Sequence, residues 1–333
     1  MGLRAAVIGA GSWGTTVASI LSANTQTILW AREPSIVDAI NAGDGNQRYL
    51  PGMKLHAQLK ATSNIQEAVA DADLVVMAVP AKAMRASMTQ LVGVVRPWVP
   101  IISLAKGFEQ ETGLRMTQVI EEIAPNHPVG VLTGPNLARE IIQGYAAASV
   151  LAMVDDGMMR NLKPLFETAR FRIYTNTDVI GCELGGALKN VIAIAAGMSD
   201  GAGAGDNTRA ALITRGLAEV TRLGVAMGGA PQTFAGLAGL GDLMVTCTST
   251  LSRNHFVGVE LGKGKSIETI IAEMDQVAEG VNSSRIVMRF SEQFGINMPI
   301  ARSVYEVCHE NSTAARAFRG LLRFGAASEA EPG

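Results

Sequence analysis

The stretch RAAVIGAGSWG, residues 4–14, decides the fold of the N-terminal half of the chain. It opens with an apolar run typical of a buried strand, and a helix-like segment follows from Thr15 to Ala23. Between them, Gly9, Gly11 and Gly14 have the spacing G-x-G-x-x-G. In this position the first glycine allows a tight turn, the second lets the backbone approach a pyrophosphate, and the third lets helix and strand pack closely. The stretch therefore predicts a dinucleotide-binding turn.

The rest of the N-terminal half alternates short apolar runs with helical patterns. Further strands are expected at Thr27–Trp30, Asp73–Val79, Pro100–Ser103, Val129–Leu132, Ala146–Val154 and Phe171–Thr175. Helices are expected at Pro34–Ala42, Ile65–Ala70, Lys82–Val95, Leu114–Ile123 and Met158–Ala169. Strands that are apolar throughout are buried on both faces, which indicates a parallel sheet with crossover helices.

The pattern changes near Asp178. From Val179 to Phe324 the sequence has helical spacing and almost no β-rich run, and Gly-rich breaks interrupt it at Asp200–Asp206, Gly224–Pro231 and Gly236–Gly241. The fold class expected is α/β. We expect a Rossmann-type parallel-sheet domain over residues 1–178, an all-helical (all-α) C-terminal domain over residues 179–325, and a flexible tail over residues 326–333.

The bulk composition agrees with a folded two-domain protein. The 333 residues exceed what one hydrophobic core usually organises, and 48% of them are hydrophobic. The formal net charge of −2 argues against a nucleic-acid partner, because such proteins carry a concentrated basic excess. The longest apolar stretch, Val191–Met198, is too short to span a bilayer, and the N-terminal apolar run is too short for a signal peptide. Neither a membrane span nor a targeting segment is expected.

The cysteines and histidines predict no metal site and no disulfide framework. Cys182, Cys247 and Cys308 lie far apart in the sequence, and no pair has CxxC spacing. The four histidines are scattered as well. A reducing cytoplasm is the compartment that fits this cysteine usage.

Arg32 and Glu33 follow the second expected strand, where the adenosine ribose of a dinucleotide binds. Arg32 can stack on adenine or meet a 2′-phosphate, whereas Glu33 can accept a hydrogen bond from a 2′-hydroxyl. The alternative is two solvated charges at the start of a helix, since an acidic residue is favourable there in any case. The cofactor is therefore NAD or NADP, and Arg32 favours acceptance of NADP(H).

Lys106, in SLAKG at residues 103–107, follows another buried strand. Ligands of open α/β sheets bind beyond the carboxyl ends of the strands, so Lys106 is a candidate for contact with substrate or nicotinamide. The alternative is that Lys106 is an ordinary surface lysine.

Lys189 and Asn190 lie in the middle of an apolar helical run, beside Gly185 and Gly186. Small residues there would let another backbone or a cofactor come close. A lysine among Ala, Ile, Val and Leu costs free energy unless it has a partner or a purpose. Lys189 is thus a candidate catalytic residue, and a snorkelling lysine at the edge of the core is the alternative.

Two further motifs follow in the C-terminal half. The sequence GLAGLGD, residues 236–242, is expected to be a loop that ends in Asp242. Ser252, Arg253 and Asn254 supply a hydroxyl, a guanidinium fork and an amide, which suit a phosphate group. Ser252 can also cap a new helix whose N–H groups face the anion. A simple cap beside a solvated arginine is the alternative.

Together these stretches resemble the NAD(P)-dependent glycerol-3-phosphate dehydrogenase family. The resemblance rests on their order and spacing over nearly the whole chain, from Arg4 to Phe324. The stretches are GAGSWG at 9–14, LAKG at 104–107, GP at 134–135, ELGGALKN at 183–190, GDNTRAALITRG at 205–216, GLGD at 239–242 and SRN at 252–254.

The resemblance implies an enzyme that reduces dihydroxyacetone phosphate reversibly at C2, in a cleft between a Rossmann domain and a helical domain. It implies a homodimer and a role in supplying phospholipid glycerol. Its implied catalytic residues are Lys189 as proton donor and acceptor, Lys106 and Asp242. Its implied substrate-binding residues are Lys106, Gly134, Asn136, Lys189, Asn190, Asp242, Thr246, Ser252, Arg253 and Asn254. Its implied cofactor-binding residues are Gly9, Gly11, Ser12, Trp13, Gly14, Arg32, Glu33, Lys106, Ala138, Arg253, Val277 and Glu279.

One position departs from the family pattern, because Asn136 stands where serine or threonine is expected most often. Two other functions are compatible with parts of the sequence. Relatives of 6-phosphogluconate dehydrogenase or ketopantoate reductase also combine a Rossmann domain with a helical domain and a catalytic lysine, but SRN at 252–254 and GLGD at 239–242 argue against them. A cofactor-binding sensor without catalysis would leave Lys189 and Asp242 idle.

Overall fold

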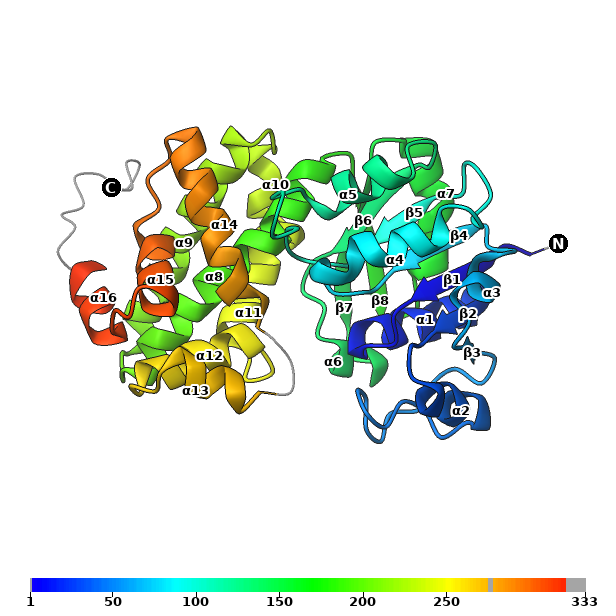
Figure 1. The fold of residues 1–333 in the computed structure, drawn as a ribbon, viewed down its shortest axis with the longest axis horizontal. Helices are drawn as coiled ribbons and strands as arrows, with labels where there is room; N and C mark the ends of the chain where they lie inside the picture. The colour runs from blue at the N-terminus through cyan, green and yellow to red at the C-terminus, as the bar shows by residue number, and fades with distance from the viewer. Residues whose placement is uncertain (1, 275–277, 322–333) are drawn as a thin grey trace. The chain divides into compact units, whose positions relative to one another are not determined.

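The computed structural model describes residues 2–274 and 278–321 of the chain (Figure 1). The chain divides after Val179 into two compact units, which we call the sheet unit and the helical unit. The boundary expected from the sequence lies one residue earlier. The expected tail, residues 326–333, is outside the described residues.

The sheet unit contains an eight-stranded sheet in the order β3-β2-β1-β4-β5-β6-β7-β8. Its strands are β1 Arg4–Ile8, β2 Gln26–Trp30, β3 Lys60–Thr62, β4 Leu74–Met77, β5 Ile101–Ser103, β6 Val129–Thr133, β7 Ala147–Met153 and β8 Phe171–Asn176. The chain order reverses beside β1, between β2 and β4. A ligand-binding crevice forms at such a reversal in doubly wound folds.

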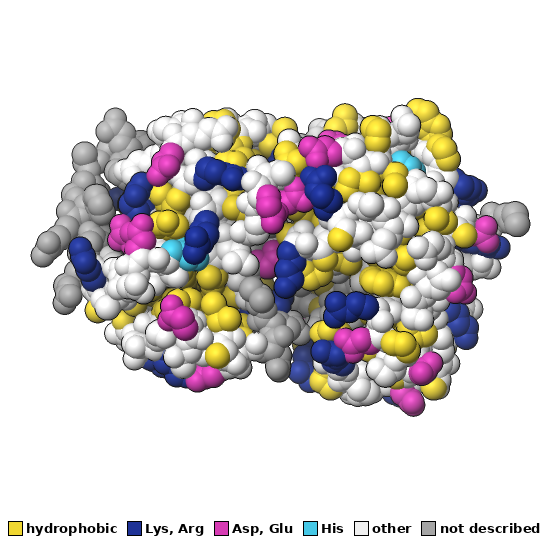
Figure 2. Space-filling view, in the orientation of Figure 1, with side chains coloured by type: hydrophobic (Ala, Val, Ile, Leu, Met, Phe, Trp, Pro, Cys, Tyr) yellow, Lys and Arg dark blue, Asp and Glu magenta, His cyan; other side chains and the backbone are white. Residues whose placement is uncertain are grey.

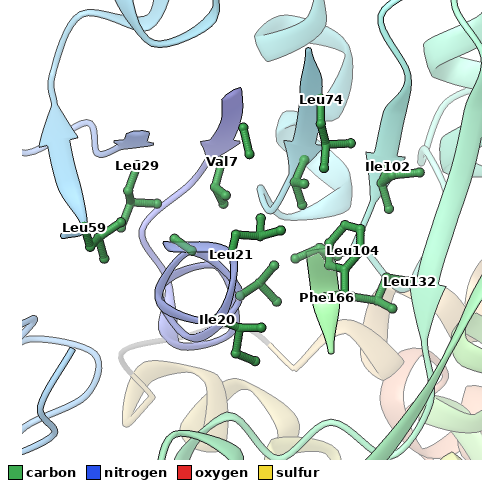
Figure 3. Close-up of a cluster of buried hydrophobic side chains, with 14 of the residues drawn as sticks. Val7, Ile20, Leu21, Leu29, Leu59, Leu74, Ile102, Leu104, Leu132 and Phe166 are labelled. Atoms are coloured by element: carbon green, nitrogen blue, oxygen red, sulfur yellow. The ribbon is translucent and has the colours of Figure 1, made fainter. Parts of the chain in front are cut away.

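The helices of the sheet unit lie on both faces of the sheet. They are α1 Ser12–Asn24, α2 Pro34–Ala42, α3 Ile65–Val69, η1 Ala81–Ala83, α4 Met84–Leu91, α5 Met116–Ile123, α6 Ala138–Ile142 and α7 Asp156–Phe166. One hydrophobic cluster joins the strands to α1, α2 and α7, and a second joins them to α3, α4 and α5. In the first cluster, Leu21 of α1 points toward the strands that carry Val7 and Leu74 (Figure 3).

Neighbouring residues of one strand contribute to opposite clusters. In β1, Val7 belongs to the cluster under α1, whereas Ile8 belongs to the cluster under α4. Both side chains are fully buried. Burial on both faces explains why these strands read as continuous apolar runs, as the sequence indicated.

The prediction of a parallel sheet is confirmed with one correction. All neighbouring strands pair parallel except β6 and β7, which pair antiparallel with Thr133 opposite Val150. The connection between them holds only the five-residue helix α6, whereas a parallel return needs a crossover that is usually a full helix. The structure also adds β3, a three-residue edge strand that the sequence did not predict.

In the helical unit, every regular element of residues 180–274 and 278–321 is a helix, as predicted. The helices are α8 Val179–Gly201, α9 Asp206–Ala226, α10 Pro231–Ala235, η2 Leu237–Gly241, α11 Asp242–Thr248, α12 Arg253–Gly262, α13 Ile267–Ala272, α14 Glu279–Phe294, α15 Pro299–His309 and α16 Ala314–Leu321. The prediction of a loop at 236–242 is wrong, because η2 is a π-helical turn that leads directly into α11.

Helix α8 is the centre of the helical unit. By length and composition it could cross a membrane, since its most apolar window has a mean hydropathy of 1.5, but 94% of that window is buried inside the protein. The longest apolar stretch of the sequence, Val191–Met198, is only part of this helix. Its burial is that of a core helix, covered by the surrounding helices of its own unit.

The surface carries charge of both signs. On the face shown in Figure 2, Lys and Arg side chains are interspersed with Asp and Glu. This agrees with the formal net charge of −2.

Candidate functional site

The three glycines of the β1–α1 turn have three different reasons to be glycine. Gly9 has a φ of +119°, and a Cβ there would lie 2.7 Å from the carbonyl oxygen of Ala78. A Cβ on Gly14 would lie 2.0 Å from the carbonyl oxygen of Gly9. A Cβ on Gly11 would meet nothing within 4 Å. The turn therefore leaves open space at Gly11, the N-cap of α1, where the helix N-terminus favours a pyrophosphate.

The predicted cofactor residues beside this turn make contacts within the sheet unit. The Ser12 hydroxyl donates to the carbonyl oxygen of Tyr49 over 2.8 Å, and the Trp13 ring packs edge-on against Phe171. The Ala138 carbonyl accepts a hydrogen bond from Thr16 of α1. The start of α6 therefore lies next to the first turns of α1.

Arg32 and Glu33 follow β2, as expected. Arg32 is exposed, and Glu33 is the residue that precedes α2. The structure adds Arg48, which forms an ion pair with the Glu33 carboxylate and lies over the Tyr49 ring. Sequence reasoning missed Arg48, because no local pattern connects it with a strand end. Two guanidinium groups therefore lie around the end of β2, and the only carboxylate predicted for the ribose is already paired.

A second group of predicted residues gathers at the carboxyl ends of β5 and β6. The Lys106 ammonium donates to the carbonyl oxygen of Gly134 over 2.8 Å. Gly134 has a φ of +132°, which favours glycine. Two residues later, the Asn136 side chain accepts a hydrogen bond from the buried Ser149 of β7 over 2.7 Å. Adjacent parallel strands thus bring Lys106 and the segment after β6 together.

In the helical unit, Lys189 lies on α8 with only 5% of its surface exposed. Its ammonium donates to the Asp242 carboxylate over 2.6 Å and also to the Thr246 hydroxyl. Asp242 opens α11, and Thr246 lies one turn further on the same helix. A buried ammonium needs such a counter-charge and hydrogen-bond acceptors. The snorkelling alternative is therefore wrong for Lys189.

Asn190 and Asn254 link three helices near this pair. The Asn254 amide nitrogen donates to the Asn190 side-chain oxygen over 2.9 Å, and the Asn254 side-chain oxygen accepts from the Gly280 backbone N–H over 2.9 Å. Helix α12 therefore begins beside α8 and beside the first turn of α14. Glu279, the first residue of α14, is brought to the same place.

Ser252 caps α12, because its hydroxyl accepts from the His255 backbone N–H. Arg253 follows and is exposed, while Ser252 and Asn254 are buried. The side chain of His255 turns away, and its Nε2 lies 2.8 Å from a carboxylate oxygen of Asp200. Val277, the remaining predicted cofactor residue, lies outside the described residues.

Close contact between α8 and α12 fixes this arrangement. A Cβ on Gly197 of α8 would lie 2.1 Å from the carbonyl oxygen of His255, and a Cβ on Gly258 of α12 would lie 2.1 Å from the carbonyl oxygen of Ile194. Both obstacles are backbone atoms, which cannot rotate aside. Glycines on the two helices therefore set the spacing between the helix of Lys189 and the helix of Arg253.

The described residues contain no group of three or more His, Cys, Asp or Glu side chains placed to hold a metal ion. What the helical unit offers instead is a buried ammonium–carboxylate pair and, on the next helix, a capped N-terminus that carries an arginine. An ammonium can move a proton, and a guanidinium at a helix N-terminus can bind a phosphate.

Two sequence profiles match the chain along nearly its whole length. The profile described as NAD-dependent glycerol-3-phosphate dehydrogenase N-terminus matches residues 4–159, and the corresponding C-terminus profile matches residues 178–319. The chain belongs to this family. The rival assignments to other Rossmann dehydrogenases with a helical domain are thereby excluded.

Individual relatives of this glycerol-3-phosphate dehydrogenase family agree over the full length. A protein of Sphingopyxis alaskensis named glycerol-3-phosphate dehydrogenase (NAD(P)+) 2 is 59% identical over 333 residues, with 100% of both chains covered. A glycerol-3-phosphate dehydrogenase (NAD(P)+) of Mycobacterium avium is 53% identical and covers 96% of this chain and 94% of its own. The crystal structure of the Coxiella burnetii glycerol-3-phosphate dehydrogenase superposes with a TM-score of 0.91 at 35% identity, covering 96% of this chain and 99% of that one.

Proposed function

We propose that this protein transfers a hydride reversibly between NAD(P)H and C2 of dihydroxyacetone phosphate, giving sn-glycerol 3-phosphate. The observation that carries the proposal is the buried pair of Lys189 and Asp242 in a chain of this family. The relatives named above carry the same activity in their names.

The glycine turn after β1 fits the cofactor, since a Cβ at Gly11 would fill the space that a pyrophosphate needs. When bound, the nicotinamide cofactor supplies the hydride to the carbonyl carbon. Lys189 then donates a proton to the carbonyl oxygen, on which negative charge develops, and its amine takes that proton back in the reverse direction. Asp242 and Thr246 hold the ammonium in one position. We assign to Lys106 the role of supplying a second positive charge to the substrate.

The phosphate end of the substrate is assigned to the start of α12. Arg253 can give two parallel charge-assisted hydrogen bonds to phosphate oxygens, and the N-terminus of the ten-residue helix adds favourable backbone dipoles. Ser252 and Asn254 hold this helix start in place. Binding energy from the remote phosphate orients C2 for reaction. Gly134, Asn136 and Asn190 are assigned to the rest of the substrate.

We extend the proposal to three properties that the family resemblance implies. These are a homodimer, a cytoplasmic location and a role in supplying the glycerol backbone of phospholipids. The odd, widely spaced cysteines support a reducing compartment, and all three are free and buried. Light scattering of the purified protein tests the dimer directly, and a monomer at micromolar concentration would refute it.

The decisive assay follows oxidation of NADH and of NADPH by the purified protein with dihydroxyacetone phosphate. Substitution Lys189→Ala is expected to lower kcat by about 10²- to 10⁴-fold, the usual contribution of a general acid, while cofactor affinity changes less than about twofold. Lys263→Ala, which removes an exposed lysine next to α12, is the matched control and should keep normal activity. A wild-type protein that binds the cofactor but oxidises neither form would instead support a sensor.

A further inference from the structure

Helices α8 and α12 pack through glycines, and this contact sets their spacing without setting their register. A Cβ on Gly258 of α12 would meet the backbone oxygen of Ile194, and a Cβ on Gly262 would meet that of Met198. The two helices therefore run in the same direction. Because glycine has no side chain, nothing at these points enters a groove of the partner helix. Other contacts are needed to stop α12 from sliding along α8.

Two neighbouring side chains in the first turn of α12 bind α8 at separate points. Asn254 donates to Asn190 over 2.9 Å, as described above. The Nε2 of His255 lies 2.8 Å from a carboxylate oxygen of Asp200, ten residues further along α8. At 1.5 Å of rise per residue, the two points on α8 are about 15 Å apart along the helix axis. Two contacts so far apart resist both sliding and rotation of α12.

The contact between His255 and Asp200 is a hydrogen bond of defined direction. A carboxylate can only accept, so the Nε2–H of His255 donates, whichever charge the ring carries. Only 12% of the His255 side chain and 18% of the Asp200 side chain are exposed, so water competes little for this bond. On its other side, the Asp200 carboxylate lies 3.3 Å from the Arg209 guanidinium of α9. Asp200 is thereby held between α9 and α12.

Arg209 belongs to the stretch GDNTRAALITRG, residues 205–216, which has no role in the site described above. Its guanidinium also pairs with Asp206 in the first turn of α9. The stretch therefore supplies a positive charge, fixed on α9, that holds the Asp200 carboxylate in place for His255.

We propose that His255 and Asp200 are positioning residues, which fix α12 along α8 so that Arg253 meets the substrate phosphate. The inference rests on the proposed function for the identity of that phosphate. Arg253 lies two residues before His255 in the same helical turn, so a shift of His255 carries Arg253 with it. A displacement of about 1 Å at a substrate-positioning group can cost about 100-fold in rate. In this role neither His255 nor Asp200 touches the substrate.

Comparison of two substrates tests this role. His255→Ala is expected to lower kcat/KM for dihydroxyacetone phosphate by about 10- to 100-fold, mainly through KM. For dihydroxyacetone, which lacks the phosphate, kcat/KM is expected to change less than about twofold. Damage to the fold or to the position of Lys189 would lower both values alike. Equal losses on the two substrates, or no loss on either, would overturn the proposal.

Further variants test the hydrogen bond itself. His255→Gln can still donate to Asp200, because the amide nitrogen of glutamine takes the place of Nε2, and should recover most of the activity. His255→Asn is too short to do so and should resemble His255→Ala. In an Arg253→Ala background, His255→Ala should change kcat/KM less than about twofold, because the residue that it positions is gone. A glutamine variant no better than asparagine, or a further large loss in the Arg253→Ala background, would contradict the assignment.

His127→Ala is the matched control, since His127 makes a partly buried hydrogen bond to the carbonyl oxygen of Val99 in the sheet unit. It should leave kcat/KM for both substrates unchanged. A crystal structure of ligand-free His255→Ala gives a readout that needs no activity, because the first turn of α12 should be displaced along α8 relative to wild type. An unchanged position would overturn the proposal. Failure of the wild-type protein to reduce dihydroxyacetone phosphate would instead contradict the proposed function, and the crystallographic result would still stand.

Discussion

Lys189 and Asp242 serve both stability and chemistry, and these two roles are separable. Only 6% and 2% of their side chains are exposed. Removing one partner of a buried ion pair leaves an uncompensated charge, which typically costs about 3–5 kcal/mol, whereas replacing both partners by neutral groups is often harmless. Asp242→Asn should therefore lower the free energy of unfolding by about that amount. The double variant Lys189→Met, Asp242→Asn should recover most of it while remaining inactive.

Urea unfolding and the dihydroxyacetone phosphate assay, run on the same preparations, measure the two effects. A double variant as unstable as Asp242→Asn alone would show that the charge of Lys189 is not the source of the instability. A double variant with near-normal turnover would remove both residues from the proposed chemistry.

The arginines at the end of β2 predict a cofactor preference. Arg48 pairs with one oxygen of the Glu33 carboxylate and offsets its charge, and Arg32 is exposed beside it. Arg32→Ala should raise KM for NADPH by about tenfold or more, since an arginine–phosphate hydrogen bond is charge-assisted, and should change KM for NADH little. The exposed Arg172 of β8 provides the matched control, Arg172→Ala. Equal effects of Arg32→Ala on both cofactors would contradict a 2′-phosphate contact.

At the scale of elements, the close packing of α8 against α12 predicts that activity depends on the distance between these two helices. A Cβ on Gly258 would lie 2.1 Å from the backbone oxygen of Ile194, so Gly258→Ala must push α12 away from α8. We expect a loss of about 1–3 kcal/mol in stability, as for overpacking, and at least a tenfold fall in kcat/KM because Arg253 moves with its helix. Gly93→Ala is the control, since a Cβ there meets nothing within 4 Å. Unchanged kinetics would show that the spacing of the two helices is not critical.

Elements with strong local signals were predictable from the sequence. Helix α2 has the predicted bounds, because Pro34 fixes its first turn and Gly43 ends it in the left-handed conformation. The antiparallel direction of β7 was not predictable, since an apolar run looks the same in either direction. The π-helical turn η2 depends on close packing, where a Cβ on Gly185 would lie 2.6 Å from the carbonyl oxygen of Ala238. That contact joins residues far apart in the chain.

The same distinction applies to the candidate site. The glycine turn after β1 could be predicted because strand, turn and helix are contiguous in the sequence. Lys189 stood out as a charge in an apolar run, but its pairing with Asp242, 53 residues away, was implied only by the family resemblance. Arg48 and Ser149 carried no local signal, since each contacts a neighbour brought close by folding.

At the scale of the whole molecule, one buried carboxyl group links global stability to pH. Glu219 of α9 is 2% exposed, and its carboxylate accepts hydrogen bonds from the backbone N–H groups of Ile300 and Ala301 at the start of α15. Burial raises the pKa of Glu219 from 4.5 to about 7, although the two backbone hydrogen bonds and the nearby charge of Arg222 oppose the rise. The folded protein therefore keeps this proton at a pH where the unfolded chain has lost it.

The sign of the effect follows from proton linkage. The stability contributed by a raised pKa is fully present below the unfolded value of 4.5 and is lost as pH rises through about 7. Over that window Glu219 should lower the free energy of unfolding by about 3 kcal/mol. Glu219→Gln cannot titrate. The free energy of unfolding of this variant minus that of wild type should therefore be about 3 kcal/mol larger at pH 8 than at pH 4.5. Comparing the two proteins cancels the contribution of other titrating groups to the pH dependence, such as His309, whose pKa is lowered by burial. Urea unfolding at both pH values measures the difference, and parallel pH profiles would mean that the Glu219 carboxyl is ionised throughout this range in the folded protein.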